Sequence, residues 1–311
     1  MSGKGGSKVA VVAAILANLL IAVSKFVAGA LTGSSAMIAE GVHSLVDTGN
    51  GGLVLWGMRR SARPADAGHP FGHGMELYFW TLIVAVSIFG IGGGVSAYEG
   101  VQHLMHPTAV ENPLPAYLVL AIAFVIEGAS FTVAIREFGR AKGSRRALDF
   151  IRASKDPSLF TVVFEDSAAM LGLVIAFVGV LMGQITGSPY FDGAASVLIG
   201  LILMSVAWVL ARETKGLLIG EGVEPAVLER MRAVVTADPG VAHCGSIRTM
   251  YLGPNDVLVN LDVAFKKDLD YGEVAAAIQR IEAALKASAP EIGRVYIEAQ
   301  SLKRAKSETE D

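Results

Sequence analysis

The chain of 311 residues is poor in charged residues and has almost no cysteine. Charged residues make up 18% of it, whereas a soluble domain carries about 25%, and hydrophobic residues make up 52%. A single cysteine, Cys244, excludes an intramolecular disulfide and a multi-cysteine metal cluster; we expect it to be a small buried side chain. A net charge of −3 argues against a nucleic-acid partner. The composition predicts a membrane protein with a smaller soluble part.

Two enzyme motifs are also absent from the sequence. There is no Walker A loop, so we expect no ATP hydrolysis within this chain, and there is no H-E-x-x-H motif of a zinc hydrolase. We therefore expect a protein that is not an enzyme and has no resident cofactor.

The first apolar run, Val9 to Leu31, is too long for the core of a signal peptide, and we expect it to be a retained span.

Six apolar stretches approach or exceed the roughly 20 residues that a helix needs to cross a bilayer. They lie near residues 8–32, 36–60, 76–104, 113–138, 157–184 and 190–217. The connections after the first, third and fifth stretches contain no Lys or Arg, whereas the N-terminal segment carries Lys, the second connection carries Arg and the fourth carries both. The positive-inside rule then predicts that both termini are cytoplasmic. We expect an integral membrane protein, of a bacterial inner (plasma) membrane.

A soluble domain is predicted to follow the six spans. We divide the chain into a transmembrane domain (1–219), a cytoplasmic domain (220–300) and a polar, disordered tail (301–311). Residue patterns in the second domain predict, in chain order, helix, strand, strand, helix and strand. These elements are Pro225–Thr236, Ser246–Leu252, Val257–Phe265, Tyr271–Ser288 and Arg294–Ala299. The order αββαβ predicts a small two-layer α+β fold of the ferredoxin-like type.

Two ionisable residues share one face of the second apolar stretch. His43 and Asp47 are four residues apart, and Glu40 lies on the same stripe. A charged group at bilayer depth costs a few kcal/mol, so such groups face a pathway, bind an ion or pair with one another. Imidazole and carboxylate suit Zn²⁺, with Fe²⁺, Mn²⁺ and Co²⁺ as alternatives. The other interpretation is a hydrogen-bonded His–Asp pair without a metal.

Further ionisable residues lie in other stretches. Glu165 and Asp166 are adjacent and would point about 100° apart on a helix, so we choose Asp166 as a metal ligand. Glu165 is a tentative ligand, a proton relay or the partner of a basic group. Glu127 is a candidate proton carrier or a structural hydrogen-bonding group, and His43 is a further proton-coupling candidate. Lys25 in the first stretch either extends toward the interface or pairs with an acidic residue.

The loop after the second stretch has the composition of a metal site. It places Asp66, His69 and His73 within eight residues, with Gly and Pro between them. The alternative is a loop that caps the third span with solvated histidines.

At this point the chain resembles the cation diffusion facilitator family of metal/proton antiporters over nearly its whole length. The segments that carry the resemblance are Gly33-Ser34-Ser35-Ala36, Ala39 to Asp47, His69 to Gly74, Asp166 with Leu171-Gly172, and Asp192-Gly193-Ala194-Ala195-Ser196. Two further runs, Tyr78-Phe79-Trp80 and Phe164 to Ala169, are most similar to the branch that contains mitochondrial-type zinc transporters and bacterial relatives.

The resemblance implies six transmembrane helices, a cytoplasmic domain that forms a homodimer, and metal efflux driven by proton entry. It also implies a transport site with two ligands from span two and an H-x-x-x-D pair from span five. His43, Asp47 and Asp166 match this pattern. Val162, four residues before Asp166, stands where the pattern has a histidine. The fourth ligand is then water, Glu165 or a residue from another helix.

The resemblance extends to the loop and to the C-terminal domain. Asp66, His69 and His73 match a second family metal site. Asn260 and Glu298 stand where metal-binding members have histidines, so we expect this domain to dimerise by packing, without a binuclear metal cluster.

We therefore predict a proton-coupled exporter of divalent transition metals that works by alternating access, with metal cations, protons, the bilayer and a second copy as partners. One alternative is a metal-responsive membrane scaffold that binds metal at the loop without transporting it, which Val162 favours. Another is a transporter of small organic cations.

Overall fold

The computed structural model describes the backbone of residues 4–108, 112–147, 150–151 and 154–300, and side chains from residue 18 on, except those of residues 158, 159 and 300. The predicted tail 301–311 lies outside these residues. The chain forms two compact units. The helical unit comprises Met1–Met58, Phe79–Arg152 and Pro157–Lys215, and the mixed unit comprises Arg59–Tyr78, Ala153–Asp156 and Gly216–Asp311. Because the mixed unit includes the loop near residue 66, the domain division at 219 and 220 stays a prediction.

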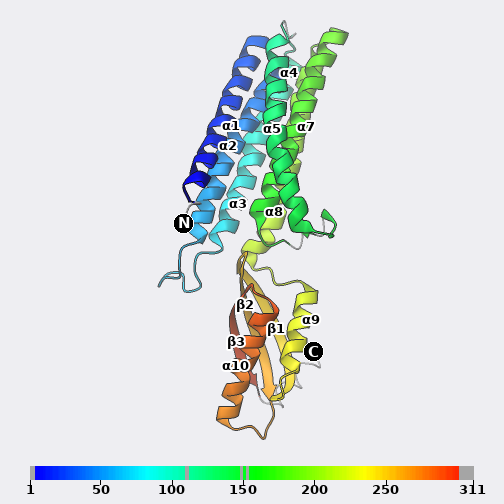
Figure 1. Cartoon of the computed structure of the whole chain (residues 1–311). Helices are drawn as coiled ribbons and strands as arrows, with labels where there is room; N and C mark the ends of the chain where they lie inside the picture. The colour runs from blue at the N-terminus through cyan, green and yellow to red at the C-terminus, as the bar shows by residue number, and fades with distance from the viewer. Residues whose placement is uncertain (1–3, 109–111, 148–149, 152–153, 301–311) are drawn as a thin grey trace. The chain divides into compact units, whose positions relative to one another are not determined.

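Long helices lie side by side in the helical unit (Figure 1). They are α1 (Lys4–Thr32), α2 (Ser35–Ser61), α3 (Glu76–Ser87), η1 (Ile88–Val95), α4 (Ser96–Met105), α5 (Leu114–Lys142), α7 (Pro157–Thr186) and α8 (Tyr190–Ile219). Their ends agree with the predicted stretches to within about one helical turn, with α3, η1 and α4 forming the third stretch.

Four helices in the described part of the chain are long and apolar enough to cross a membrane. They are Glu76–Met105, Leu114–Lys142, Phe160–Thr186 and Tyr190–Ile219. The first helix contributes a shorter apolar segment, Asn18–Thr32. Helix α2 is not in this group because it carries the ionisable residues Glu40, His43 and Asp47 as well as several glycines. The fold therefore contains a helical membrane domain with four strongly apolar helices.

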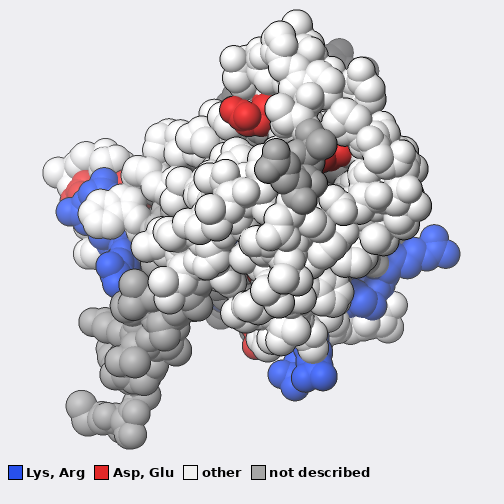
Figure 2. All heavy atoms as spheres, turned by 90° about the horizontal axis from the view of Figure 1, so that it is seen from above, with Lys and Arg blue, Asp and Glu red and all other residues white. Residues whose placement is uncertain are grey.

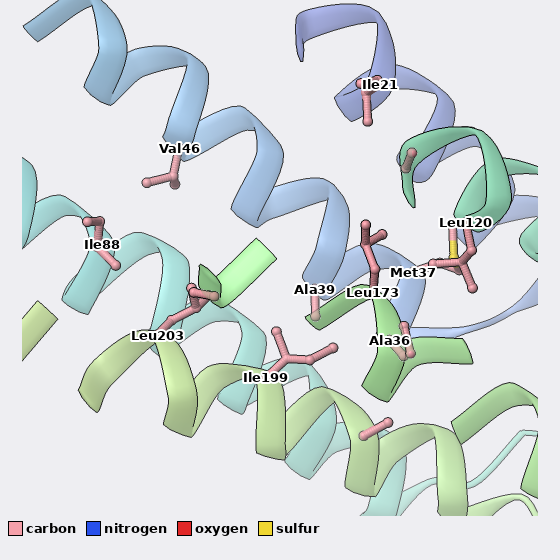
Figure 3. Packing of buried hydrophobic residues seen from close by; sticks show 14 of the residues in the cluster. Ile21, Ala36, Met37, Ala39, Val46, Ile88, Leu120, Leu173, Ile199 and Leu203 are labelled. Atoms are coloured by element: carbon pink, nitrogen blue, oxygen red, sulfur yellow. The ribbon is translucent and has the colours of Figure 1, made fainter. Parts of the chain in front are cut away.

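Buried side chains of these helices form one hydrophobic core. Leu203 of α8 lies near Ile88 of η1, Ile199 of α8 lies near Ala39 of α2, and Met37 of α2 lies near Leu173 of α7 (Figure 3). Alanines occupy many of the remaining core positions, so the helices approach each other closely. This packing buries Glu40 and His43 of α2 within the bundle, and the Asp47 side chain is 19% exposed.

The membrane helix Glu76–Met105 contains a π-helical segment that the sequence did not predict. In η1 the run IFGIGGGV has four residues without a side chain. A Cβ on Gly93 would lie 2.6 Å from Met204 Cγ and 3.0 Å from the carbonyl oxygen of Gly200. Farther along, a Cβ on Gly100 would lie 2.5 Å from the backbone nitrogen of Val197. Glycine is therefore required where this span packs against α8.

The start of α2 is held by a carboxylate from α8. Asp192 accepts hydrogen bonds from the backbone N–H groups of Ser35 (2.5 Å) and Ala36 (3.3 Å). It also accepts from the hydroxyls of Ser34 (2.5 Å) and Ser35 (2.9 Å). The first N–H groups of a helix have no partner within the helix, and a carboxylate there also stabilises the helix dipole. Asp192 thus fixes one end of the helix that carries His43 and Asp47.

The mixed unit contains the predicted order of elements. These are α9 (Pro225–Thr236), β1 (Val241–Gly253), β2 (Asp256–Phe265), α10 (Tyr271–Ser288) and β3 (Ile292–Gln300). The sheet order is β1-β2-β3, with β1 antiparallel and β3 parallel to β2. Strand β1 begins five residues before the predicted Ser246, because register irregularities let its pairing continue through Cys244 to Val241. Cys244 is buried in the core of this unit, as expected.

A glycine test follows from the packing of α4 on α8. Gly100→Ala should lower the free energy of unfolding by about 1–3 kcal/mol, because its Cβ meets backbone atoms that cannot rotate away. Gly90→Ala in η1 is the matched control, since a Cβ there has no atom within 4 Å. Thermal unfolding of the purified full chain in detergent measures both. Equal stability of the two variants would contradict the described packing.

Candidate functional site

An acidic cavity of about 180 Å³ lies among α1, α2, α5 and α7, and we call it the acidic chamber. Four carboxylates line it, together with small polar and apolar groups. The lining residues are Asn18, Ser44, Asp47, Glu127, Ser130, Val162, Glu165, Asp166 and Ala169. The fold therefore brings together predicted residues from three separate helices. Four carboxylates around one cavity attract cations.

His43 lies next to the chamber residue Asp47. The His43 Nε2 atom is 3.4 Å from Asp47 Oδ2, and the histidine is buried. Within the described part of the chain, neither ring nitrogen of His43 nor Asp47 Oδ1 has a hydrogen-bond partner. A tetrahedral Zn²⁺ with bonds of about 2.0–2.1 Å spaces its ligand atoms about 3.3 Å apart. The pair therefore has a spacing that suits a shared metal ion, although His43 is not one of the residues that line the chamber.

Glu165 and Asp166 both line the chamber, in spite of their adjacency on α7. Glu165 Oε1 accepts a hydrogen bond from Asn50 Nδ2 of α2 at 2.9 Å. Asp166 Oδ2 accepts one from the Ser130 hydroxyl of α5 at 3.3 Å. The two side chains thus have different partners on different helices. Both residues face the same cavity although they are adjacent on the helix, and their roles as metal ligands stay a prediction.

Val162 also lines the chamber, one helical turn before Asp166. Its side chain is 42% exposed. An apolar group therefore stands at the position where the resemblance implies a fourth ligand. The described residues contain one group of three His, Cys, Asp or Glu residues with ligand atoms all within 4.8 Å, and that group is in the loop. The chamber residues are more widely spaced.

Lys25 pairs with acidic residues inside the bundle. This is the second of the two alternatives that the sequence left open, the first being extension toward the membrane interface. Its Nζ atom lies 2.9 Å from Glu40 Oε2 and 2.8 Å from Glu127 Oε1. It also donates to the Ser44 hydroxyl at 2.8 Å. Lys25 and Glu40 are fully buried. Glu127 therefore has a structural ion-pair role as well as a place in the chamber wall.

Sequence reasoning missed the neutral polar residues of the site. Asn18, Ser44 and Ser130 line the chamber, and Asn50 holds Glu165. The sequence does contain a signal for these residues, because each is a polar residue within a predicted span. Short polar side chains are common in membrane helices, however, and nothing local shows which of them face a shared cavity.

The loop residues Asp66, His69 and His73 form the compact group of the mixed unit. Asp66 Oδ1 lies 3.3 Å from His69 Nδ1, and Asp66 Oδ2 lies 3.0 Å from His73 Nε2. The two imidazole rings have centroids 4.2 Å apart. His73 is buried, and its Nδ1 has no hydrogen-bond partner in the described structure. These distances fit a tetrahedral metal ion with about 3.3 Å between ligand atoms.

Hydrogen bonds hold the Asp66 carboxylate in place. Besides the bond to His73, the backbone N–H groups of Gly68 and His69 donate to its Oδ1 at 2.9 and 2.7 Å. The bond with His73 and the N–H of His69 lower the pKa of Asp66 below its usual range. The carboxylate therefore stays ionised, and available to a metal, well below neutral pH. The hydrogen bonds contribute stability at pH values above the ordinary pKa of aspartate, and that contribution is lost as the pH falls through the lowered value.

Loss of this carboxylate should weaken metal binding at the loop. In a background with Asp47→Ala and Asp166→Ala, Asp66→Asn should lower Zn²⁺ affinity by about 10-fold or more, because it removes the one anionic ligand of the group. Asp268→Asn, at an exposed position of the mixed unit, is the control. Equilibrium dialysis of the purified full chain measures the affinities. Unchanged affinity in Asp66→Asn would exclude the loop group as a metal site.

Comparisons with known proteins cover both units. The family model "Cation efflux transmembrane domain" matches residues 11–219, and "Cation efflux protein, cytoplasmic domain" matches residues 223–300. A protein named "Proton-coupled zinc antiporter SLC30A9, mitochondrial", from Xenopus laevis, is 37% identical over 265 residues, which cover 84% of this chain and 47% of that protein. "Manganese efflux system protein MneP" from Bacillus subtilis is 26% identical over 268 residues, 82% of this chain and 84% of that protein.

A solved structure, "MamM CTD - Copper form", is 18% identical, with a TM-score of 0.24, over 25% of this chain and 74% of that one. This chain spans about half the length of the antiporter it matches. The helical membrane unit, the mixed unit with its small sheet, and the two matching family domains lead to one conclusion: the chain belongs to the cation efflux, or cation diffusion facilitator, family.

Proposed function

We propose that this protein exports a divalent transition-metal cation in exchange for protons, by alternating access. Zn²⁺ is the foremost substrate, with Fe²⁺, Mn²⁺ and Co²⁺ as alternatives. The observation that carries the proposal is the acidic chamber, in which carboxylates of α2, α5 and α7 face one cavity inside an apolar bundle. Ionisable groups in membrane helices are costly, and they mark ion pathways. The name of the matched antiporter supports zinc and protons.

The metal ligands that we propose are His43, Asp47 and Asp166, with Glu165 as a tentative fourth. Buried polar atoms without a hydrogen-bond partner are costly, and in this region they include both ring nitrogens of His43 and one oxygen of Asp47. A bound cation would satisfy them. Glu165 has one oxygen engaged by Asn50, which leaves its other oxygen for a metal or a proton.

We propose His43, Glu127 and Glu165 as the residues that couple metal movement to protons. Glu127 and Glu165 lie in the wall of the chamber, and His43 adjoins it. A metal binds the deprotonated form of its ligands, so protons and metal compete for the same atoms. Because of this competition, protons that enter the chamber can displace the metal.

We propose six membrane spans, formed by α1, α2, the continuous helix from α3 to α4, α5, α7 and α8, with both termini cytoplasmic. The charge distribution supports this orientation. Seen from above, the face in view is mostly white, with red Asp and Glu in its upper part and blue Lys and Arg only at the outline of the picture (Figure 2). The membrane that we propose is a bacterial inner membrane; the positive-inside rule assigns sidedness, and the matched relatives come from both mitochondria and a bacterium.

We propose that the mixed unit is a ferredoxin-like domain through which two copies dimerise, in line with the matched cytoplasmic family domain. Its sheet and the helices α9 and α10 provide a separate core. The loop residues Asp66, His69 and His73 would hold a metal ion in this unit, which they fit in both spacing and donor type.

Removal of a chamber carboxylate should abolish transport. We expect Asp47→Ala and Asp166→Ala each to reduce Zn²⁺ flux into proteoliposomes to background while the dimer stays intact, because each removes an anionic ligand in a low-dielectric setting. Glu99→Gln in α4 is the control, since Glu99 does not line the chamber. A metal-sensitive dye and a pH-sensitive dye inside the vesicles record metal and proton movement together.

The assay also separates the alternatives. Metal flux with opposite proton flux supports the exporter. Metal binding without flux supports the scaffold, and flux of organic cations that ignores metal supports the third hypothesis. Wild-type rates in Asp47→Ala and Asp166→Ala would contradict the proposed site.

The Val162 position controls metal preference in this proposal. Val162→His should raise transport of Zn²⁺ relative to Mn²⁺, because it adds an imidazole to a chamber whose wall is otherwise rich in oxygen donors. Val162→Leu, which changes the side chain without adding a ligand, is the control. Competition between the two metals in the vesicle assay gives the ratio. An unchanged ratio in folded Val162→His would show that residue 162 does not reach the metal.

A further inference from the structure

The Lys25 ammonium uses all of its hydrogen-bonding capacity inside the helical unit. An ammonium group has three N–H donors. Here they point to Glu40 Oε2 at 2.9 Å, Ser44 Oγ at 2.8 Å and Glu127 Oε1 at 2.8 Å. These acceptors come from α2 and α5, whereas Lys25 belongs to α1. The ammonium is therefore a fixed charge and not a side chain that reaches for the interface.

The three acceptors are the kind of groups that hold a metal cation. Two carboxylate oxygens and one hydroxyl oxygen surround a single point, and hard cations take oxygen ligands of this type. The ammonium nitrogen occupies that point. A lysine at this position supplies one positive charge that cannot leave, whereas a free ion could exchange.

This network is part of the chamber wall. Ser44 and Glu127 both line the cavity. Glu127 Oε2 and Glu40 Oε1 are buried and have no hydrogen-bond partner among the residues that the structure describes. Glu40 also reaches α7, since a Cβ on Gly172 would overlap its Oε1 atom. One ammonium and two carboxylates leave a formal net charge of about −1 beside the proposed metal ligands.

We propose that Lys25 takes the place of a second cation next to the transport site and so limits the chamber to one divalent ion. This inference rests on the proposed function, because it assigns the remaining carboxylates to the transported metal. In a low-dielectric bundle, a fixed positive charge between Glu40 and Glu127 opposes entry of another ion at that point. Lys25 is thus a specificity-determining residue that sets the number of ions bound.

Counting bound Mn²⁺ ions tests the proposal. Mn²⁺ suits oxygen donors, and its paramagnetic resonance signal distinguishes free from bound ions. Lys25→Ala in the purified full chain should bind one more Mn²⁺ per protomer than the wild type, because it leaves two carboxylates, a hydroxyl and room for an ion. Methylammonium, which offers the same charged group on a free molecule, should displace the additional ion.

Two matched variants show which residues the additional Mn²⁺ ion requires. Lys25→Ala/Glu40→Gln restores the formal charge of the network and should return the count to that of the wild type. Lys286→Ala removes a lysine that pairs with Glu282 on the exposed face of α10, and should not change the count. An equal count in Lys25→Ala and the wild type would overturn the proposal, and so would a gain that persists in the double variant.

Glu40→Gln keeps Lys25 and provides a second test if Lys25→Ala does not fold. This variant removes one of the two negative charges that compensate the Lys25 ammonium, so more of its positive charge acts on the chamber. The affinity of the chamber for Mn²⁺ should therefore fall about 10-fold, although Glu40 does not line the cavity. Unchanged affinity would overturn the proposal. Neither measurement requires transport, so a wild-type protein that failed to move metal would reject the proposed function and leave these outcomes to be judged separately.

Discussion

The ion network of Lys25, Glu40 and Glu127 is the interaction on which the arrangement of the helical unit depends. Hydrophobic burial does not drive helices together in lipid, because lipid tails are as apolar as the helices. Polar links and close packing therefore determine which helices are neighbours. Removal of one partner from a buried ion pair typically costs about 3–5 kcal/mol, since the other charge remains buried. The network thus joins α1 to both α2 and α5.

Helix α2 is fixed at two levels by charged groups from other helices. Asp192 of α8 binds its first N–H groups, and Lys25 of α1 binds Glu40 and Ser44 farther along. His43 and Asp47 follow within the next turns. Their positions are therefore set by contacts that do not involve a metal. Such an arrangement pre-forms one side of the proposed transport site, while Glu165 and Asp166 on α7 are held separately by Asn50 and Ser130.

Much of the fold could be predicted from the sequence because local signals define it. Hydrophobic length gave the helices of the bundle, and the pattern from Pro225 to Ser288 gave both helices of the mixed unit with their observed ends. The π-helical segment η1 was not predictable in this way. Within η1, Gly93 packs against Met204 and Gly200 on another helix, and the sequence of η1 alone contains no information about that neighbour.

The candidate site was predictable by residue type and less so by geometry. Ionisable residues in apolar stretches are conspicuous, so Asp47, Glu127 and Asp166 could be singled out before their positions were known. That Lys25 pairs with Glu127 could not be predicted, because the two residues are 102 positions apart and each had several conceivable partners. For the same reason the role of Asn50 as the partner of Glu165 became visible only in the folded chain.

In the function that we propose, the charge balance of the chamber favours exchange of metal for protons over simple passage of metal. Five carboxylates and one ammonium belong to the chamber and its ion network, and these are Glu40, Asp47, Glu127, Glu165, Asp166 and Lys25. Entry of a divalent cation would change the charge of the chamber by two, within an apolar bundle that screens charge less than bulk water does. Departure of protons from the same carboxylates offsets that change, and their return offsets the loss of the metal. In this proposal the ammonium of Lys25, which is held by Glu40 and Glu127, keeps its charge, and the residues that face the cavity carry out the exchange.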